Sequence, residues 1–99
     1  MNKAGKQLKA YRERLLRLDK KLIGILAERA IISEEIGCIK FHEKLGIEQK
    51  QFWKESTEKR KQTLAKTPLD EKWVEKIFSS IQKQSISIQK AIIKKLNHE

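Results

Sequence analysis

Four polar or small residues interrupt a regular series of apolar residues in the first half of the sequence. Arg29 stands where the series requires an apolar residue, and steps of four, four and three from it reach Ser33, Gly37 and Lys40. Eleven residues make almost three helical turns, so Arg29 and Lys40 share one face of a helix. A cation at each end of a space lined by small side chains predicts a site for a small anion, unless both cations extend into solvent.

Two further polar residues interrupt the apolar series near the end of the chain. Ser85 lies on that series and Gln89 follows one helical turn later. Such neutral groups either form hydrogen bonds within a buried core or face a ligand. Polar interruptions on two helices favour the second, a pocket shared with Arg29 and Lys40. Arg12 lies 17 residues before Arg29. That spacing is roughly 25 Å along a helix, so only a second subunit can bring Arg12 to the same small ligand.

Three helices must position these residues, and the first is unusually long. Apolar residues recur at steps of three and four from Leu8 to Ile39 and predict an amphipathic helix over about residues 5–43, which ends before Gly46. At 1.5 Å per residue such a helix is roughly 57 Å long. The rest of a chain of 99 residues cannot cover it, so we expect a homodimer in which two long helices pack along each other.

The other two helices are shorter. A second helix is expected over about residues 48–66, although it has few apolar residues to bury. The third is expected over about residues 68–96, with Thr67 as its N-cap, Pro68 at its first position and Asp70 at its third. Because the sequence has no alternating strand pattern and no Gly-rich loop, we predict that the whole chain is one all-α domain.

The overall charge limits the partners without choosing one. The chain carries 23 Lys and Arg against 13 Asp and Glu, which gives a formal charge of +10. Such a charge suits nucleic acid, an anionic membrane or a small anionic substrate. The basic residues are spread evenly along the chain, as they are on a solvated face. We therefore rely on the position of the charges, which favours a small anion over nucleic acid or a membrane.

The compartment and the chemistry are limited by what the sequence does not contain. No apolar run approaches the ~18 residues of a membrane span, and no leader pattern precedes the first helix. Cys38 is the only cysteine, which excludes an internal disulfide and makes the cytoplasm the expected compartment. Cys38 and His42 share a helix face but lack a third ligand, so no metal site is expected.

A series of short motifs runs along most of the chain. The motifs are Tyr11-Arg12-Glu13, Leu18-Asp19-Lys20-Lys21-Leu22, Leu26-Ala27-Glu28-Arg29, Ile36-Gly37 with Lys40, Leu69-Asp70, Ile77-Phe78 and Ser85-Ile86-Ser87-Ile88-Gln89. In this order and spacing, over about residues 8–95, the chain resembles the all-helical (type II) chorismate mutases. The resemblance implies three helices per chain in an intertwined dimer. It also implies a Claisen rearrangement of chorismate to prephenate that needs no covalent intermediate, metal or other cofactor.

The resemblance also implies a role for each polar residue of the predicted pocket. Arg29 would bind one substrate carboxylate, and Arg12 of the partner subunit would bind the second. Arginine suits both tasks because its planar fork meets a carboxylate in two hydrogen bonds. Lys40 would donate to the ether oxygen and to a carboxylate. Gln89 would donate to the ether oxygen from the opposite side, and Ser85 would contact a carboxylate.

The sequence departs from the family in the stretch IEQKQFWKES, residues 47–56. Many members have Asp, Arg and Glu there, and the Asp and Glu regions hold the substrate hydroxyl. In this chain the three positions are Gln49, Phe52 and Trp53. Gln49 keeps hydrogen-bonding capacity, whereas the Trp53 ring has one N–H donor and no acceptor. We expect Gln49 to contact the hydroxyl, Trp53 to wall or support that end of the pocket, and Phe52 to pack against a neighbouring helix.

Other functions agree with parts of the same pattern. An isochorismate pyruvate-lyase or an aminodeoxychorismate mutase on this fold would use much the same cations on a similar dicarboxylate. A non-catalytic regulatory dimer, which docks onto another shikimate-pathway enzyme, would explain the departures at residues 49, 52 and 53 as lost chemistry. Nucleic-acid binding would require Phe52 and Trp53 to be exposed beside the lysines.

Overall fold

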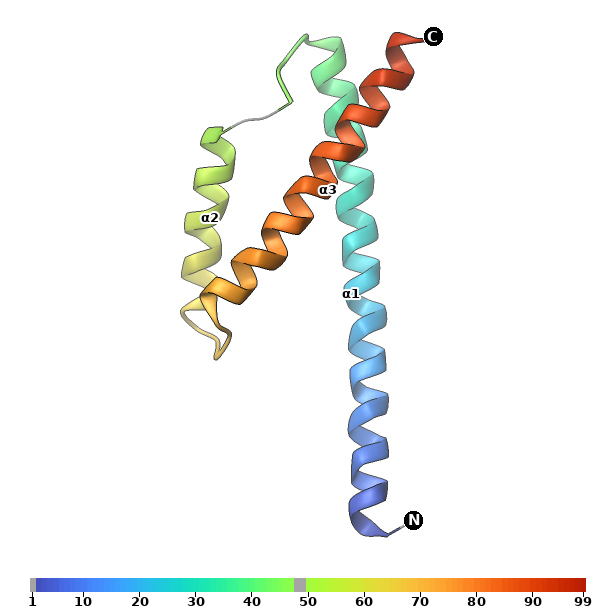
Figure 1. Ribbon diagram of the computed structural model, residues 1–99, viewed down its shortest axis with the longest axis vertical. Coiled ribbons are helices and arrows are strands. Elements are labelled where there is room, and N and C mark those ends of the chain that lie inside the picture. The colour runs from blue at the N-terminus through green and yellow to red at the C-terminus, as the bar shows by residue number, and fades with distance from the viewer. Residues whose placement is uncertain (1, 48–49) are drawn as a thin grey trace.

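The computed structural model describes residues 2–47 and 50–99, and these residues form three helices and no strands (Figure 1). Helix α1 spans Lys3–His42, α2 spans Lys50–Leu64 and α3 spans Glu71–Asn97. α1 and α3 pack against each other, and the C-terminal end of α2 lies beside the start of α3 (Figure 1). The predicted all-α class is therefore confirmed.

Both ends of α1 are closed by hydrogen bonds. At the start, the side-chain oxygen of Asn2 accepts from a backbone N–H of the first turn at 2.8 Å. At the end, the chain turns at Lys44, whose φ of 56° is left-handed, and the N–H of Leu45 donates to the carbonyl of Lys40 at 2.8 Å. A residue with a side chain loses about 1–2 kcal/mol in this conformation. The helix thus ends before Gly46, as predicted, although a lysine makes the turn.

α3 begins three residues later than predicted, because the expected N-cap is wrong. The carboxylate of Asp70, and not the hydroxyl of Thr67, accepts from the first turn, where the N–H of Trp73 donates at 2.9 Å. The hydroxyl of Thr67 instead donates to the carbonyl of Leu64 at 2.9 Å, and Pro68 lies in the bend between the two helices. A carboxylate also complements the positive end of the helix dipole, which favours Asp70 as the cap.

α1 and α3 approach each other closely at Gly37. A Cβ atom at this position would meet the side chain of Ile92 and would lie 3.1 Å from the Cα atom and 3.3 Å from the carbonyl oxygen of Gln89. These distances are shorter than ordinary van der Waals contacts. The backbone of α3 therefore lies directly on the backbone of α1, and the absence of a side chain at residue 37 makes this possible.

The residues that are buried around the crossing are mostly polar. Ser33, Lys40 and Gln89 each expose 7% of their surface or less. Val74 is the one apolar side chain buried to that degree in the part of the chain that the structure describes. The most deeply buried residues where the two helices meet therefore form a polar cluster.

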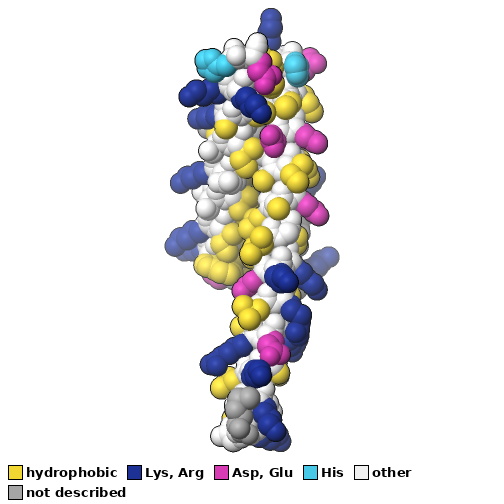
Figure 2. Space-filling view, turned by 90° about the vertical axis from the view of Figure 1, so that its right-hand side faces the viewer, with side chains coloured by type: hydrophobic (Ala, Val, Ile, Leu, Met, Phe, Trp, Pro, Cys, Tyr) yellow, Lys and Arg dark blue, Asp and Glu magenta, His cyan; other side chains and the backbone are white. Residues whose placement is uncertain are grey.

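The N-terminal half of α1 extends well beyond the other helices, as Figure 1 shows. Figure 2 shows apolar side chains on this part of the molecule beside Lys and Arg side chains. More than half of the surface is exposed at Leu8, Tyr11, Leu15, Leu18, Leu22 and Ile25. Apolar residues in such a continuous series are usually covered by a partner. Within the described ranges, none of the helices combines the length and the apolar composition that a bilayer crossing requires.

The crossing at Gly37 yields a prediction about stability. In Gly37→Ala the new methyl group must push α3 away, and we expect the free energy of unfolding to fall by about 1–3 kcal/mol. Gly24→Ala is the matched control, since a Cβ at residue 24 meets nothing within 4 Å; it should raise that free energy by about 0.5–1 kcal/mol. Urea denaturation of both variants measures the difference. Equal effects at the two positions would contradict a tight crossing.

Candidate functional site

A cavity of about 400 Å³ lies between α1, α3 and the start of α2. Its polar wall consists of Arg29, Ser33, Lys40, Gln82, Ser85 and Gln89. Its apolar wall consists of Ile32, Ile36, Ile39, Leu45, Ile47, Phe52 and Ile86. A cavity of this size is typical of small-molecule sites. Four polar residues of one chain were predicted to share a pocket, and all four line this cavity: Arg29, Lys40, Ser85 and Gln89.

A chain of hydrogen bonds links α1 and α3 along the polar wall. The ammonium group of Lys40 donates to Oε1 of Gln89 at 2.7 Å and also to the backbone carbonyl of Ile47. Nε2 of Gln89 donates to Oγ of Ser85 at 3.2 Å, and this oxygen lies 2.6 Å from Oγ of Ser33. Among the described residues, every buried side-chain nitrogen and oxygen has a hydrogen-bond partner.

The chemistry of Lys40 sets the orientation of the Gln89 amide. An ammonium group can only donate hydrogen bonds, so the oxygen of the amide must face Lys40 and the nitrogen must face away from it. Ser85 accepts one of the two amide hydrogens, and the other is available to a ligand oxygen. In the same way, Gln89 and Ile47 take two of the three ammonium hydrogens. The charged ammonium group of Lys40 and the neutral amide group of Gln89 are thus two hydrogen-bond donors that line the same cavity.

Burial makes the charge of Lys40 unusually costly. The residue exposes only 7% of its surface, and desolvation lowers the pKa of its ammonium group below the ordinary value of 10.5. The acceptors that hold it are a side-chain amide and a backbone carbonyl, both neutral. A bound carboxylate would compensate this desolvation by direct attraction. The site therefore favours an anionic ligand.

The two predicted arginines occupy different places. Arg29 lines the cavity and also a neighbouring hollow of about 320 Å³ between α1 and α3. Its residue surface is largely exposed, in contrast to Lys40. Arg12 is exposed on the N-terminal half of α1 and is not among the residues that line the cavity of its own chain. Only a second subunit, as expected from the spacing, would bring Arg12 to this cavity.

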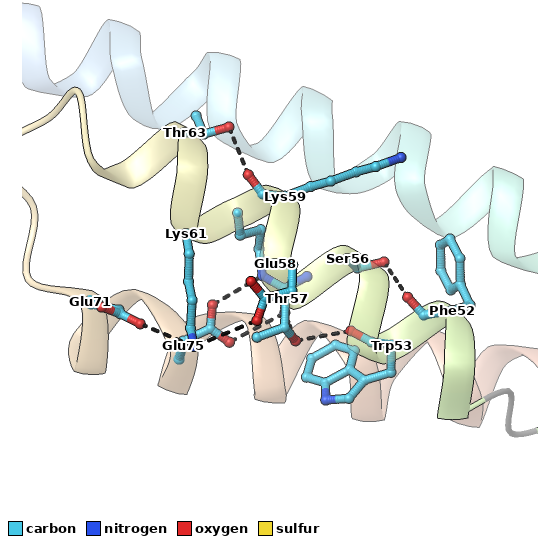
Figure 3. A network of polar contacts seen from close by, with 11 residues as sticks. Phe52, Trp53, Ser56, Thr57, Glu58, Lys59, Lys61, Thr63, Glu71 and Glu75 are labelled. Atoms are coloured by element: carbon cyan, nitrogen blue, oxygen red, sulfur yellow. Dashed lines mark hydrogen bonds and ion pairs between the residues drawn. The ribbon is translucent and has the colours of Figure 1, made fainter.

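The stretch that departs from the family is divided between two sides of α2. Phe52 points toward α1 and lines the cavity, whereas Trp53 points toward α3, as Figure 3 shows. The ring of Trp53 lies below the guanidinium of Arg60, whose Cζ is 4.6 Å from the ring centroid. The structure therefore does not bring Trp53 into the cavity of its own chain. Gln49 and the expected start of α2 at residue 48 lie outside the described residues.

Contributors to the site that the sequence did not predict include Gln82, Phe52 and the backbone carbonyl of Ile47. Phe52 was expected only to pack against a helix, and its place on the cavity wall follows from the side of α2 that faces α1. The backbone carbonyl of Ile47 carries no sequence signal, because any residue type would supply it. Ser33 lies on the predicted face of α1. Its hydrogen bond with Ser85 depends on the register between α1 and α3, which spacing within one helix does not specify.

Groups of three or more metal-ligating side chains are absent from the described part of the chain. The polar wall consists instead of cationic and neutral donors. Such a wall can bind carboxylates and stabilise negative charge that grows on an oxygen atom during a reaction.

Comparison with known proteins identifies a family for this chain. The family model described as chorismate mutase type II matches residues 11–90. The matched segment includes Arg12, Arg29, Lys40, Ser85 and Gln89. No curated protein and no solved structure matches the chain.

The lowered pKa of Lys40 predicts how stability changes with pH. In the unfolded chain Lys40 has its ordinary pKa of 10.5, and in the folded chain its pKa is lower. At pH values between these two, Lys40 is protonated in the unfolded chain and not in the folded chain. In that range the free energy of unfolding rises with pH. Lys40→Met removes this part of the rise, whereas Lys83→Met, at an exposed position of α3, keeps it. Urea denaturation at a series of pH values just below 10.5 measures it, and identical slopes in the wild type and Lys40→Met would contradict the lowered pKa.

Proposed function

The chain belongs to the type II chorismate mutase family, and on this premise we propose that it rearranges chorismate to prephenate. The observation that carries the proposal is the pair of donors on the cavity wall. Lys40 and Gln89 come from different helices, contact each other at 2.7 Å and line one cavity. Arg29 lies on the same wall.

The reaction needs little from the protein besides shape and charge. The substrate is a dicarboxylate that must adopt a compact, chair-like conformation, in which one C–O bond breaks and one C–C bond forms. Negative charge grows on the ether oxygen as the C–O bond lengthens. Donors that already point at this oxygen stabilise the transition state more than the ground state, because they need no reorganisation at the moment of reaction.

We assign these tasks to the residues of the polar wall. Arg29 binds one carboxylate with its planar fork, and Ser85 contacts a carboxylate. The remaining ammonium hydrogen of Lys40 and the remaining amide hydrogen of Gln89 both donate to the ether oxygen. Their own contacts hold these two groups in place before the substrate arrives, which is the preorganisation that the reaction requires.

The second carboxylate requires a residue from a partner subunit. We propose a homodimer in which the exposed apolar side of α1 packs against the same side of a second copy. The midpoint between residues 12 and 29 lies between Lys20 and Lys21. A two-fold axis at that point would bring the partner subunit's Arg12 opposite Arg29. The same arrangement would cover the apolar residues that α3 leaves exposed.

The first prediction from this proposal concerns turnover. Purified protein should convert chorismate to prephenate, and Arg29→Ala and Lys40→Ala should each lower kcat/KM by about 10²–10³-fold, because the loss of one preorganised donor costs about 2.7–4 kcal/mol of transition-state stabilisation. Lys83→Ala removes a cation from an exposed position and should not change kcat/KM. Near-normal activity in Arg29→Ala or Lys40→Ala would show that the reaction occurs elsewhere.

The same assay separates the other candidate functions. Incubation with isochorismate tests for a pyruvate-lyase, and incubation with aminodeoxychorismate tests for an amino-specific mutase. Activity on one of these compounds and none on chorismate would show that this compound is the substrate. Phe52 bears on the choice among these three compounds, because it places an apolar ring on the cavity wall. Absence of turnover with all three substrates, together with absence of binding to a bicyclic transition-state mimic, would indicate a non-catalytic dimer.

A second prediction tests the sharing of the site between subunits. Arg12→Ala and Arg29→Ala should each be nearly inactive as homodimers. Co-expression with two different affinity tags allows the mixed dimer to be purified, and in it one site carries both substitutions and the other carries neither. The mixed dimer should therefore regain about half of the wild-type kcat. A mixed dimer as inactive as its parents would exclude a site built from both subunits.

A further inference from the structure

The side of α2 that faces α3 contains few apolar residues. The half-buried residues of α2 are Trp53, Ser56, Thr57, Arg60 and Leu64. Their spacing places them on one side of the helix, and the other positions of this fully described helix are exposed. Only two of the five are apolar, so hydrophobic packing is only a part of what attaches α2. The central residue of this side is an arginine.

Arg60 bridges α2 and α3 through three kinds of contact. Its Nε and one terminal nitrogen donate to the two carboxylate oxygens of Glu75 on α3, both at 3.2 Å. Its Cζ lies 4.6 Å from the ring centroid of Trp53 on α2 and 4.6 Å from that of Phe78 on α3. A terminal nitrogen also donates to the hydroxyl of Thr57 at 3.1 Å.

The contacts around Arg60 are screened from solvent more than a second ion pair between these helices, that of Lys61 with Glu71. The side chain of Arg60 is 15% exposed and that of Glu75 is 26% exposed. Lys61 and Glu71 also connect α2 to α3, but their charged atoms are 3.8 Å apart and their side chains are 47% and 56% exposed. Figure 3 shows both acidic partners on α3 below α2. The planar guanidinium of Arg60 stacks on two rings and also forms two hydrogen bonds with one carboxylate. A lysine at this position would lose the planar stacking and the paired hydrogen bonds.

The opposite side of α2 borders the cavity. Phe52 directly precedes Trp53 in the sequence and points toward α1, where it lines the cavity (Figure 3). The position of α2 on α3 therefore determines where the Phe52 ring lies. We propose that Arg60 is a positioning residue that holds α2 on α3 and thereby holds Phe52 in the cavity wall, where its ring packs on the apolar body of the substrate. The part of this inference that concerns substrate rests on the proposed function.

The inference predicts which kinetic constant changes. An apolar ring that packs on the substrate contacts the ground state and the transition state about equally. Loss of such a contact raises KM and leaves kcat nearly unchanged. The donors Lys40 and Gln89 belong to α1 and α3, and they contact each other directly at 2.7 Å without the involvement of Arg60. A displaced α2 should therefore weaken substrate binding without removing the charge stabilisation.

The experiment compares Arg60→Met and Arg60→Lys with Lys61→Ala as the matched control. Hydrogen exchange of the α2 amides should become faster in Arg60→Met, less so in Arg60→Lys, and should not change in Lys61→Ala. KM should rise roughly tenfold in Arg60→Met, with kcat within about threefold of wild type. In a double-mutant cycle, Arg60→Met should raise KM little further in a Phe52→Ala background, since both changes remove the same contact.

The possible outcomes are distinct. Unchanged α2 exchange in Arg60→Met would overturn the inference, and so would a fall in kcat with constant KM or additive effects of the two changes on KM. Absence of turnover in the wild-type protein would contradict the proposed function alone, and α2 exchange would then decide whether Arg60 holds the helix. Faster exchange confined to α2, with exchange in α1 and α3 unchanged, would support the assigned role.

Discussion

The close approach of α1 and α3 at Gly37 determines the rest of the structure. Because the two backbones are in contact there, the short side chains of Ser33 and Ser85 can reach each other, and Lys40 can reach Gln89 across the same interface. These hydrogen bonds in turn make the burial of an ammonium group tolerable. A longer distance between the helices would remove the Gln89 acceptor from a buried cation, so helix packing and the polar site have the same origin.

The same arrangement explains why one chain leaves so much apolar surface exposed. α1 has 40 residues and α3 has 27, and α3 crosses only the C-terminal part of α1 (Figure 1). The apolar residues on the remaining N-terminal part of α1 are exposed. In the proposed dimer, association would cover that surface and supply Arg12 at once. Folding, assembly and completion of the site would then be one process.

Much of this molecule follows from the periodicity of its sequence, and the exceptions have physical causes. Steps of three and four predicted α1 and the shared face of Arg29 and Lys40, because both depend on one helix alone. The start of α3 was missed because Thr67 and Asp70 compete for the same role. The sides to which Phe52 and Trp53 point depend on how α2 lies against its neighbours, and no spacing within α2 specifies this. The same holds for Arg60, whose partners are on another helix.

The attachment of α2 has a consequence for how this fold can diverge. The donors of the polar wall belong to α1 and α3, whereas Phe52 belongs to a helix held mainly through Arg60 and its aromatic and acidic neighbours. Substitutions on the cavity side of α2 therefore leave the hydrogen bond between Lys40 and Gln89, which joins α1 and α3, in place. Natural selection can alter that wall one residue at a time while the cationic framework is inherited unchanged. Under the proposed function, a lineage built in this way could exchange one cyclic dicarboxylate for another without inventing a new catalyst.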